Sequence, residues 1–259
     1  MPKTVRARQR RPKVYIVGVG PGSPEYLTIR ACDAIRSSEI VLGWELDLLP
    51  IKGLLGDKEV HMQKVSNYRE VAKNVAKLAL KAGKVVAVPR VGDPCISSGL
   101  GGLLEVFSEF DIEIVPGISS IQVAAAIARV NIDDSVVVSF HDYGDHEKEK
   151  RFMLDAFRAG RHLIILTSPD LTTTEAAKFL ISSGLNPSTS AVVCSNLSLK
   201  DQIIEHGTLK GVSKKEHPWL SLLVVVNPSV PTNQEAYSTW KRWRSIHQRQ
   251  GTLPSTTSG

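Results

Sequence analysis

Short runs of apolar residues alternate with longer amphipathic segments along the first half of the chain. The apolar runs predict strands near residues 13–18, 39–43, 58–61, 84–89 and 112–116. The segments between them predict helices near 27–36, 68–82, 99–109 and 119–129. In the 68–82 segment, Val71, Val75, Leu78 and Ala79 follow the spacing of one buried helix face. This alternation predicts a mostly parallel sheet with helices on both faces.

The pattern changes at Asn131-Ile132-Asp133-Asp134, where we expect a domain boundary. Further strands are predicted near 135–140, 162–167, 190–195, 202–208 and 220–226, with helices near 147–158 and 170–183. The last two strands flank a turn-rich stretch, Gly207 to Pro218, and are expected to form an antiparallel hairpin. The second sheet should therefore be mixed. The expected units are a basic disordered tail (1–12), an N-terminal α/β domain (13–131), a C-terminal α/β domain (132–230) and a basic extension (231–259).

Three apolar runs of the first half end in turns rich in Gly and Pro. The turns are Gly18-Val19-Gly20-Pro21-Gly22, Arg90-Val91-Gly92-Asp93-Pro94 and Pro116-Gly117-Ile118-Ser119-Ser120. Small ligands bind outside the carboxyl ends of the strands in an open α/β sheet. We therefore expect the three turns to form one composite pocket.

Each turn also has a purely structural interpretation. The first is a tight turn between strand and helix, Asp93 is a turn cap, and Ser119 or Ser120 is a helix N-cap. The first turn differs from a dinucleotide-binding fingerprint because its third Gly comes one position early and Pro21 removes a donor. Leu42-Gly43-Trp44 stands where that fingerprint needs an acidic residue, which argues against a nicotinamide cofactor.

Composition and charge narrow the class of protein. Hydrophobic residues make up 42% of the 259 residues and charged residues 22%, which is ordinary for a soluble globular protein. The net charge of +6 belongs to the ends, because residues 1–13 carry +6, residues 235–259 carry +3 and the body carries −3. We therefore expect no stable nucleic-acid partner. Thr239 to Arg249 has the composition of a terminal basic helix.

No apolar run approaches the roughly 18–20 residues that cross a bilayer, so we expect no membrane association. Cys32, Cys95 and Cys194 lie far apart and suggest neither disulfides nor a zinc site. These features favour a cytoplasmic protein with reduced thiols.

One cluster of His and Asp, His141 to His146, lies at the start of the second domain. Its spacing does not place both histidines on one helix face and no third ligand is near, so we expect no bound metal. The order of Ser, Cys, His and Asp along the chain supports no nucleophile triad. A surface loop and a loop that touches substrate both remain open for this cluster.

The three turns together carry a resemblance. GVGPGSPEYLTIRA, VGDPCISSG and PGISSIQVAAA, in this order, resemble the tetrapyrrole (corrin/porphyrin) methylases from about Val14 to about Asn227. The resemblance implies a two-domain α/β fold and S-adenosylmethionine as methyl donor. Leu42-Gly43-Trp44 and Ser139-Phe140-His141-Asp142 resemble the branch that methylates C5 of (cobalt-)precorrin-7 in cobalamin biosynthesis.

The resemblance also implies the site. The implied cofactor-binding residues are Pro21, Val91, Gly92, Asp93, Ile96, Ser119, Ser120, Thr167, Asn196 and Leu222. Asp93 and His141 are candidate bases, and neither is assigned. The cationic candidates for the carboxylates of a tetrapyrrole substrate are Arg90, Arg129, Lys148 and Arg151.

The family is usually dimeric, so a homodimer is expected, and a separate enzyme would carry out C15 methylation and decarboxylation. Other acceptors remain open: uroporphyrinogen III, another precorrin, the modified histidine of elongation factor 2, or ribosomal RNA. A protein that binds the cofactor or a tetrapyrrole without catalysis also remains open.

Overall fold

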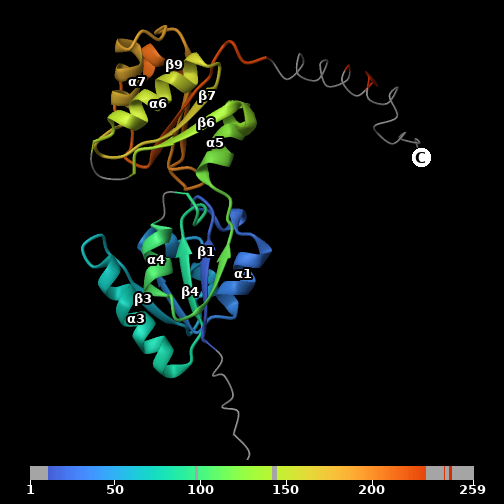
Figure 1. Cartoon of the computed structure of the whole chain (residues 1–259), viewed down its shortest axis with the longest axis vertical. Coiled ribbons are helices and arrows are strands. Elements are labelled where there is room, and N and C mark those ends of the chain that lie inside the picture. The colour runs from blue at the N-terminus through green and yellow to red at the C-terminus, as the bar shows by residue number, and fades with distance from the viewer. Residues whose placement is uncertain (1–10, 97–98, 142–144, 232–241, 243–244, 247–259) are drawn as a thin grey trace, which may run out of the picture.

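The structure, a computed structural model, describes residues 11–96, 99–141 and 145–231, together with 242, 245 and 246. Two lobes lie one above the other along the longest axis of the molecule (Figure 1). Residues 1–10 of the predicted tail and most of the predicted helix at 239–249 lie outside the described residues, whereas Pro12 O accepts a hydrogen bond from Asp111 N–H at 2.9 Å.

A parallel sheet forms the core of the first lobe, with its strands in the order β3-β2-β4-β1-β5. The strands are β1 (Lys13–Gly18), β2 (Ile40–Gly43), β3 (Glu59–Met62), β4 (Val86–Arg90) and β5 (Asp111–Val115). β1 alternates between the two faces: Val14 and Ile16 face α3 (Tyr68–Ala82) and α4 (Leu100–Val106), whereas Val17 packs with α1 (Ile29–Arg36). The expected parallel sheet with helices on both faces is confirmed.

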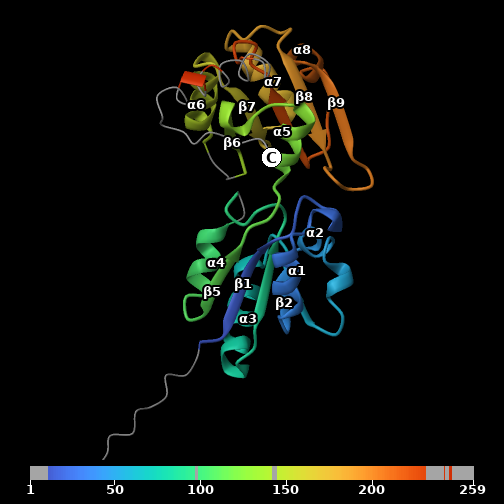
Figure 2. The same cartoon turned by 90° about the vertical axis from the view of Figure 1, so that its right-hand side faces the viewer.

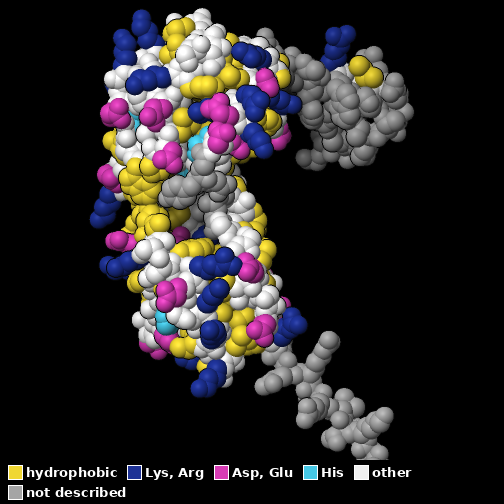
Figure 3. Space-filling model, turned by 60° about the vertical axis from the view of Figure 1, so that its left-hand side comes forward, with side chains coloured by type: hydrophobic (Ala, Val, Ile, Leu, Met, Phe, Trp, Pro, Cys, Tyr) yellow, Lys and Arg dark blue, Asp and Glu magenta, His cyan; other side chains and the backbone are white. Residues whose placement is uncertain are grey.

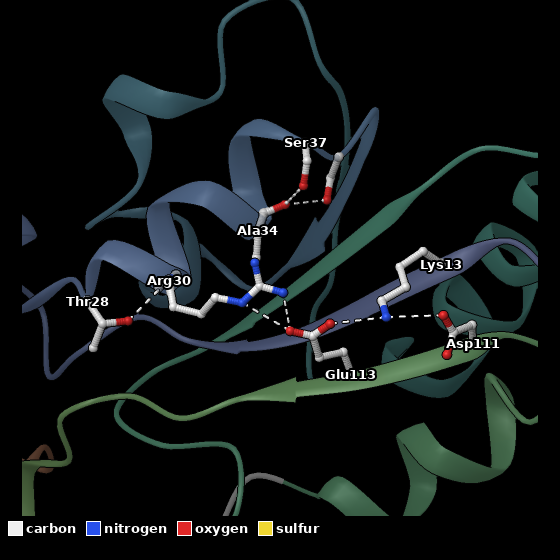
Figure 4. A network of polar contacts seen from close by, with 9 residues as sticks. Lys13, Thr28, Arg30, Ala34, Ser37, Asp111 and Glu113 are labelled. Carbon is white, nitrogen blue, oxygen red and sulfur yellow. Dashed lines mark hydrogen bonds and ion pairs between the residues drawn. The ribbon is translucent and has the colours of Figure 1, made fainter.

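Short elements complete the first lobe. They are α2 (Glu45–Leu48) and the 3-10 helices η1 (Pro24–Tyr26) and η2 (Lys52–Leu54). A polar network on the β1–β5 side joins α1 to the edge strand (Figure 4). Arg30 of α1 pairs with Glu113 of β5, and Lys13 Nζ lies 3.0 Å from Glu113 and 3.1 Å from Asp111. Arg30 and Lys13 lower the pKa of Glu113. The network holds the helix that follows the first glycine turn against the sheet.

The second lobe contains a mixed sheet in the order β6-β7-β10-β8-β9. Its strands are β6 (Ser135–Ser139), β7 (His162–Leu166), β8 (Ser190–Ser195), β9 (Ile203–Thr208) and β10 (Ser221–Val225). β6 and β7 are parallel, and the other pairs are antiparallel. The expected mixed sheet is confirmed.

The expected hairpin of the last two strands is wrong. β9 pairs with β8, and β10 lies between β7 and β8. All five residues of β10 are buried, so this strand needs a central place with both faces covered. β9 carries mostly exposed or half-buried side chains and suits an edge.

Helices cover both faces of the second sheet. α6 (Glu147–Arg158), α7 (Thr173–Ser182) and α8 (Leu209–Val212) share one core with it, and α5 (Ser120–Ala128) packs on the other face against β7 and β10. The 3-10 helix η3 (Ile132–Asp134) leads into β6. The chain therefore passes between the lobes at 116–119, one helix earlier than the expected boundary at 131, because the apolar face of α5 packs on the second sheet. The division into two independent domains stays a proposal.

Candidate active site

The three glycine-rich turns come together because β4, β1 and β5 are neighbours in a parallel sheet. Gly92 N–H donates to Gly20 O at 2.8 Å, and Val19 N–H donates to Arg90 O at 2.9 Å. Gly20 and Gly92 have φ of +77° and +71°, which favour glycine. The first and second turns therefore form one main-chain unit.

The third turn packs directly on the other two. A Cβ on Gly18 would lie 2.5 Å from Gly117 N, and a Cβ on Gly117 would lie 2.2 Å from Gly92 O. No side chain fits between these backbones, so the three strand ends meet through peptide groups alone.

The Asp93 carboxylate connects two of the turns. Its Oδ1 accepts a hydrogen bond from Cys95 N–H at 2.8 Å and its Oδ2 from Gly117 N–H at 3.0 Å. Ser119 is the N-cap of α5, with its Oγ accepting from Ile121 N–H at 3.3 Å, and Ser120 begins the helix. The capping interpretations of Asp93 and Ser119 are thus met, and both residues also lie at the composite turn.

The second lobe brings Thr167, Asn196 and Leu222 to one edge, where β7 and β8 end and β10 begins. Thr167 Oγ1 donates to Ser221 O at 2.6 Å. Asn196 has φ of 49°, and its Nδ2 donates to Asp201 Oδ2 at 2.6 Å. The Leu222 side chain is buried in the core under α5. Asn196 therefore offers a polar side chain at this edge, whereas the side chains of Thr167 and Leu222 are buried.

The two edges face each other across the waist of the molecule (Figure 2). Ser23 N–H donates to Ser198 Oγ at 2.9 Å, joining the loop after β1 to the loop after β8. A Cβ on Gly22 would lie 2.5 Å from the Leu199 side chain, and Pro21 beside it is buried. Pro21 and Gly22 therefore lie where the first turn meets the second lobe, and a ligand at the composite turn would lie between the lobes.

Arg90 is not available to a substrate carboxylate, which contradicts its predicted role. It is only 4% exposed, and its guanidinium donates to Asp47 Oδ2 at 3.1 Å and to Tyr68 Oη at 2.7 Å. Arg90 is the last residue of the continuously buried strand β4, so its side chain enters the interior at the strand end. It is stable there because a carboxylate compensates its charge.

Sequence reasoning missed Asp47. Burial raises the pKa of its carboxyl group, opposed by Arg90 and by the backbone N–H groups of Trp44 and Val91. These two N–H groups donate at 2.9 Å and 2.8 Å to different oxygens of Asp47. Asp47 is the one acid in the otherwise apolar segment 46–51, and this is the sequence feature that indicates such burial.

The other candidate base and the other cationic candidates lie on the surface of the second lobe, whereas Val91 and Ile96 are half-buried in the turn after β4. His141 is exposed just after β6, and its N–H donates to Ser139 Oγ at 3.3 Å. Arg129 is exposed at the end of α5, and Lys148 and Arg151 are exposed on α6. Residue 142 lies outside the described part of the chain, as do 143 and 144. Across the described residues, no group of three or more His, Cys, Asp or Glu is placed to hold a metal.

A family model for tetrapyrrole (corrin/porphyrin) methylases matches residues 13–213. The chain belongs to this family. A probable cobalt-precorrin-7 C(5)-methyltransferase of Methanocaldococcus jannaschii is 33% identical, over 82% of this chain and 96% of that protein. The cobalt-precorrin-4 C(11)-methyltransferase of the same organism is 28% identical, over 87% of this chain and 91% of that protein.

A solved structure shares the fold of this tetrapyrrole methylase. The precorrin-6Y methylase of Archaeoglobus fulgidus superposes with a TM-score of 0.61 at 23% identity, over 83% of this chain and 98% of that chain. The predicted family and fold are confirmed. As a tetrapyrrole methylase, the protein is a methyltransferase whose methyl donor is S-adenosylmethionine.

The facing edges fit such a donor. S-adenosylmethionine combines a cationic amino acid, a ribose and an adenine, which are recognised by carboxylate, hydroxyl and peptide groups. The first edge supplies the Asp93 carboxylate and the Ser119 and Ser120 hydroxyls beside turns that carry no side chain at 92 and 117. The second edge adds the half-buried Asn196 side-chain amide. In the described part of the chain, no helix is long and apolar enough to cross a bilayer.

Proposed function

We propose that this tetrapyrrole methylase transfers the methyl group of S-adenosylmethionine to C5 of (cobalt-)precorrin-7 in cobalamin biosynthesis. The observation that carries this proposal is the 33% identity to a probable cobalt-precorrin-7 C(5)-methyltransferase, over 96% of that protein. Leu42-Gly43-Trp44 and the Ser139-Phe140-His141 segment support the same branch.

Methyl transfer requires mainly that the acceptor carbon, the methyl group and the sulfur atom be aligned. S-adenosylmethionine supplies a methyl group already activated by its sulfonium. The bond from C5 to the methyl carbon forms as the bond from sulfur to that carbon breaks, and S-adenosylhomocysteine leaves with the electron pair. Alignment of the reacting atoms alone contributes about 7–11 kcal/mol in well-oriented systems. The protein therefore needs a rigid donor site and a matching acceptor surface, and the main-chain construction of the composite turn supplies that rigidity.

In this proposal, the donor lies along Val91, Gly92, Asp93 and Ile96 and against Ser119 and Ser120, with Thr167 and Asn196 on the adenine side. Asp93 already accepts two N–H groups, so we assign it to holding the turns. His141, exposed just after β6, is the better candidate to remove a proton from the methylated ring. His141→Gln should then lower kcat while leaving the affinity for S-adenosylhomocysteine unchanged.

Methyl transfer to purified cobalt-precorrin-7 tests the function. We expect a product heavier by one methyl group, together with an equal amount of S-adenosylhomocysteine, and slower transfer to cobalt-precorrin-4. Calorimetry should find one S-adenosylhomocysteine site per chain. Binding without transfer to any tetrapyrrole would favour a protein that binds the cofactor without catalysis.

We also propose a homodimer, since closed two-fold association is the commonest arrangement of oligomers. A separate enzyme for C15 methylation and decarboxylation belongs to the same proposal. Light scattering that reports the 28.3 kDa of one chain over a wide range of concentrations would contradict the dimer.

A further inference from the structure

The carboxyl edge of the first sheet has two different halves. The glycine-rich turns occupy the ends of β4, β1 and β5. The ends of β2 and β3 carry large apolar side chains exposed to solvent instead: Trp44 after β2, and Met62 and Val65 at and after β3. Exposed apolar groups gathered at one edge mark a binding surface more often than isolated ones do.

A second tryptophan meets this half from the other lobe. Trp219 precedes β10, and its ring centroid lies 6.1 Å from that of Trp44 with 44° between the planes. Trp219 is 58% exposed and Trp44 is 38% exposed, so the pair leaves much of its aromatic surface uncovered. Figure 3 shows hydrophobic side chains gathered at the waist between the lobes.

One buried carboxylate connects this surface to the proposed donor site. Asp47 Oδ2 accepts from Trp44 N–H at 2.9 Å, and Asp47 Oδ1 accepts from Val91 N–H at 2.8 Å. Val91 adjoins Gly92 and Asp93 of the composite turn. Asp47 thus joins the backbone of Trp44 to the second turn through two hydrogen bonds. The Arg90 guanidinium donates to Asp47 Oδ2 and keeps the carboxylate in place.

We propose that Trp44 and Trp219 contact the face of the acceptor macrocycle, and that Asp47 is a positioning residue that sets the distance from this surface to the donor. A cobalt-precorrin is a broad ring with an apolar, partly conjugated face and carboxylates at its rim, and such a face stacks on indoles. Lys64, exposed between Gln63 and Val65, offers an ammonium group to such a carboxylate. The identity of the acceptor rests on the proposed function, whereas the location of the surface does not.

Tryptophan fluorescence and kinetics test this surface together. In a Trp240→Phe, Trp243→Phe background, Trp44 and Trp219 are the remaining tryptophans, and a bound tetrapyrrole should quench them by energy transfer. The probes for quenching are cobalt-precorrin-7 and cobalt-precorrin-4, whose conjugated rings absorb at the emission wavelength of tryptophan; uroporphyrinogen III is not conjugated and is tested by methyl transfer alone. Trp44→Ala and Trp219→Ala should each raise the KM for the methylated acceptor at least tenfold, with the Kd of S-adenosylhomocysteine within twofold. Trp44→Phe should recover most of the loss.

Phe152→Ala, which removes an exposed aromatic side chain from α6, is the matched control and should leave KM unchanged. An unchanged KM in both the Trp44→Ala and the Trp219→Ala variant would overturn the proposal. So would a loss of S-adenosylhomocysteine affinity as large as the rise in KM, or a changed oligomeric mass with a normal KM. If the wild-type protein methylates another probe, the C5 assignment fails while the surface is still tested with that probe. The absence of quenching by both cobalt-precorrins would overturn the surface.

Asp47→Asn tests the positioning role. It should lower kcat by more than tenfold, while the variant still binds S-adenosylhomocysteine and its tryptophan fluorescence is still quenched normally by the acceptor. If that variant does not fold, Tyr68→Phe takes its place, because it removes only one hydrogen bond made by Arg90. We then expect a severalfold lower kcat with a normal KM. Normal kcat in the folded variant would contradict a positioning role.

Discussion

The facing edges of the two lobes consist of different chemical groups: main-chain atoms in the first lobe and side chains in the second. In the first lobe, the ends of β4, β1 and β5 meet through glycine backbones, with the side chain of Asp93 as a brace. In the second lobe, side chains form the edge: Thr167 Oγ1 donates to Ser221 O, and the Ser195 and Ser221 hydroxyls lie 2.6 Å apart. Main-chain contacts at van der Waals distance leave no room for a different side chain, whereas a hydroxyl network can be altered one group at a time.

The lobes also differ in how they bury titratable groups. The first lobe buries an ion pair, Arg90 with Asp47, whose charges compensate each other. The second lobe buries histidines: burial lowers the pKa of His162 and of His217. The Nδ1 atom of His162 accepts a hydrogen bond from Asn227 N–H at 2.9 Å, which the neutral ring alone can do. Acid should therefore act on the two lobes unequally.

The largest effect is expected from Gly117→Ala. The new methyl group would lie 2.2 Å from Gly92 O, and backbone atoms on both sides cannot yield cheaply. We expect a loss of at least about 3 kcal/mol in the free energy of unfolding, the upper end for an overpacked site, and loss of S-adenosylhomocysteine binding. Gly53→Ala, with no atom within 4 Å of the new methyl group, is the control. Urea denaturation and calorimetry measure both quantities, and a stable Gly117→Ala protein would contradict the close packing of the turns.

Asp93→Ala should have the next largest effect. It leaves the N–H groups of Cys95 and Gly117 without their acceptor and should cost about 1–3 kcal/mol in stability and in donor affinity. Asp111→Ala, which removes an exposed carboxylate paired with Lys13, should cost no more than about 1 kcal/mol. Lower stability with unchanged affinity would mean that Asp93 only braces the turns.

Acidification should weaken the second lobe before the first. The unfolded chain protonates His162 and His217 near 6.5, whereas the folded chain does so only at lower pH. The unfolded state then binds more protons, so the free energy of unfolding falls as the pH drops through this range. Amide hydrogen exchange at about pH 5.5 and 7.5, corrected for intrinsic rates, should show lost protection in β7 and β10 more than in β1 and β4. Equal losses in both sheets would contradict this.

The smallest effect concerns the thiols. Cys95 is exposed beside the composite turn, and desolvation and the Asp93 charge raise its pKa. Cys194 is buried, which raises its pKa to about 11. A maleimide at neutral pH should label Cys95 and spare Cys194, and S-adenosylhomocysteine should slow the labelling of Cys95 severalfold. Cys32 on α1 serves as the control. Unprotected Cys95 at saturating ligand would argue against a donor site at this turn.

Local patterns in the sequence determined much of this molecule. The apolar runs before residues 18, 90 and 116 predicted strands, and the glycines after them predicted turns that meet at one edge. These predictions succeed because strand and turn preferences depend on neighbouring residues, and because parallel strands necessarily share a carboxyl edge. The motifs in these turns also carried the family resemblance.

Only the tertiary structure decided the rest. It placed β10 in the centre of its sheet, α5 on the second lobe, Arg90 in the interior and Trp44 against Trp219. Each of these outcomes depends on a partner distant in sequence: Arg90 needed Asp47, and Trp44 needed an aromatic ring from the other lobe. A single sequence shows that a residue is charged or apolar, whereas burial and pairing are set by the competition among all segments for the same core.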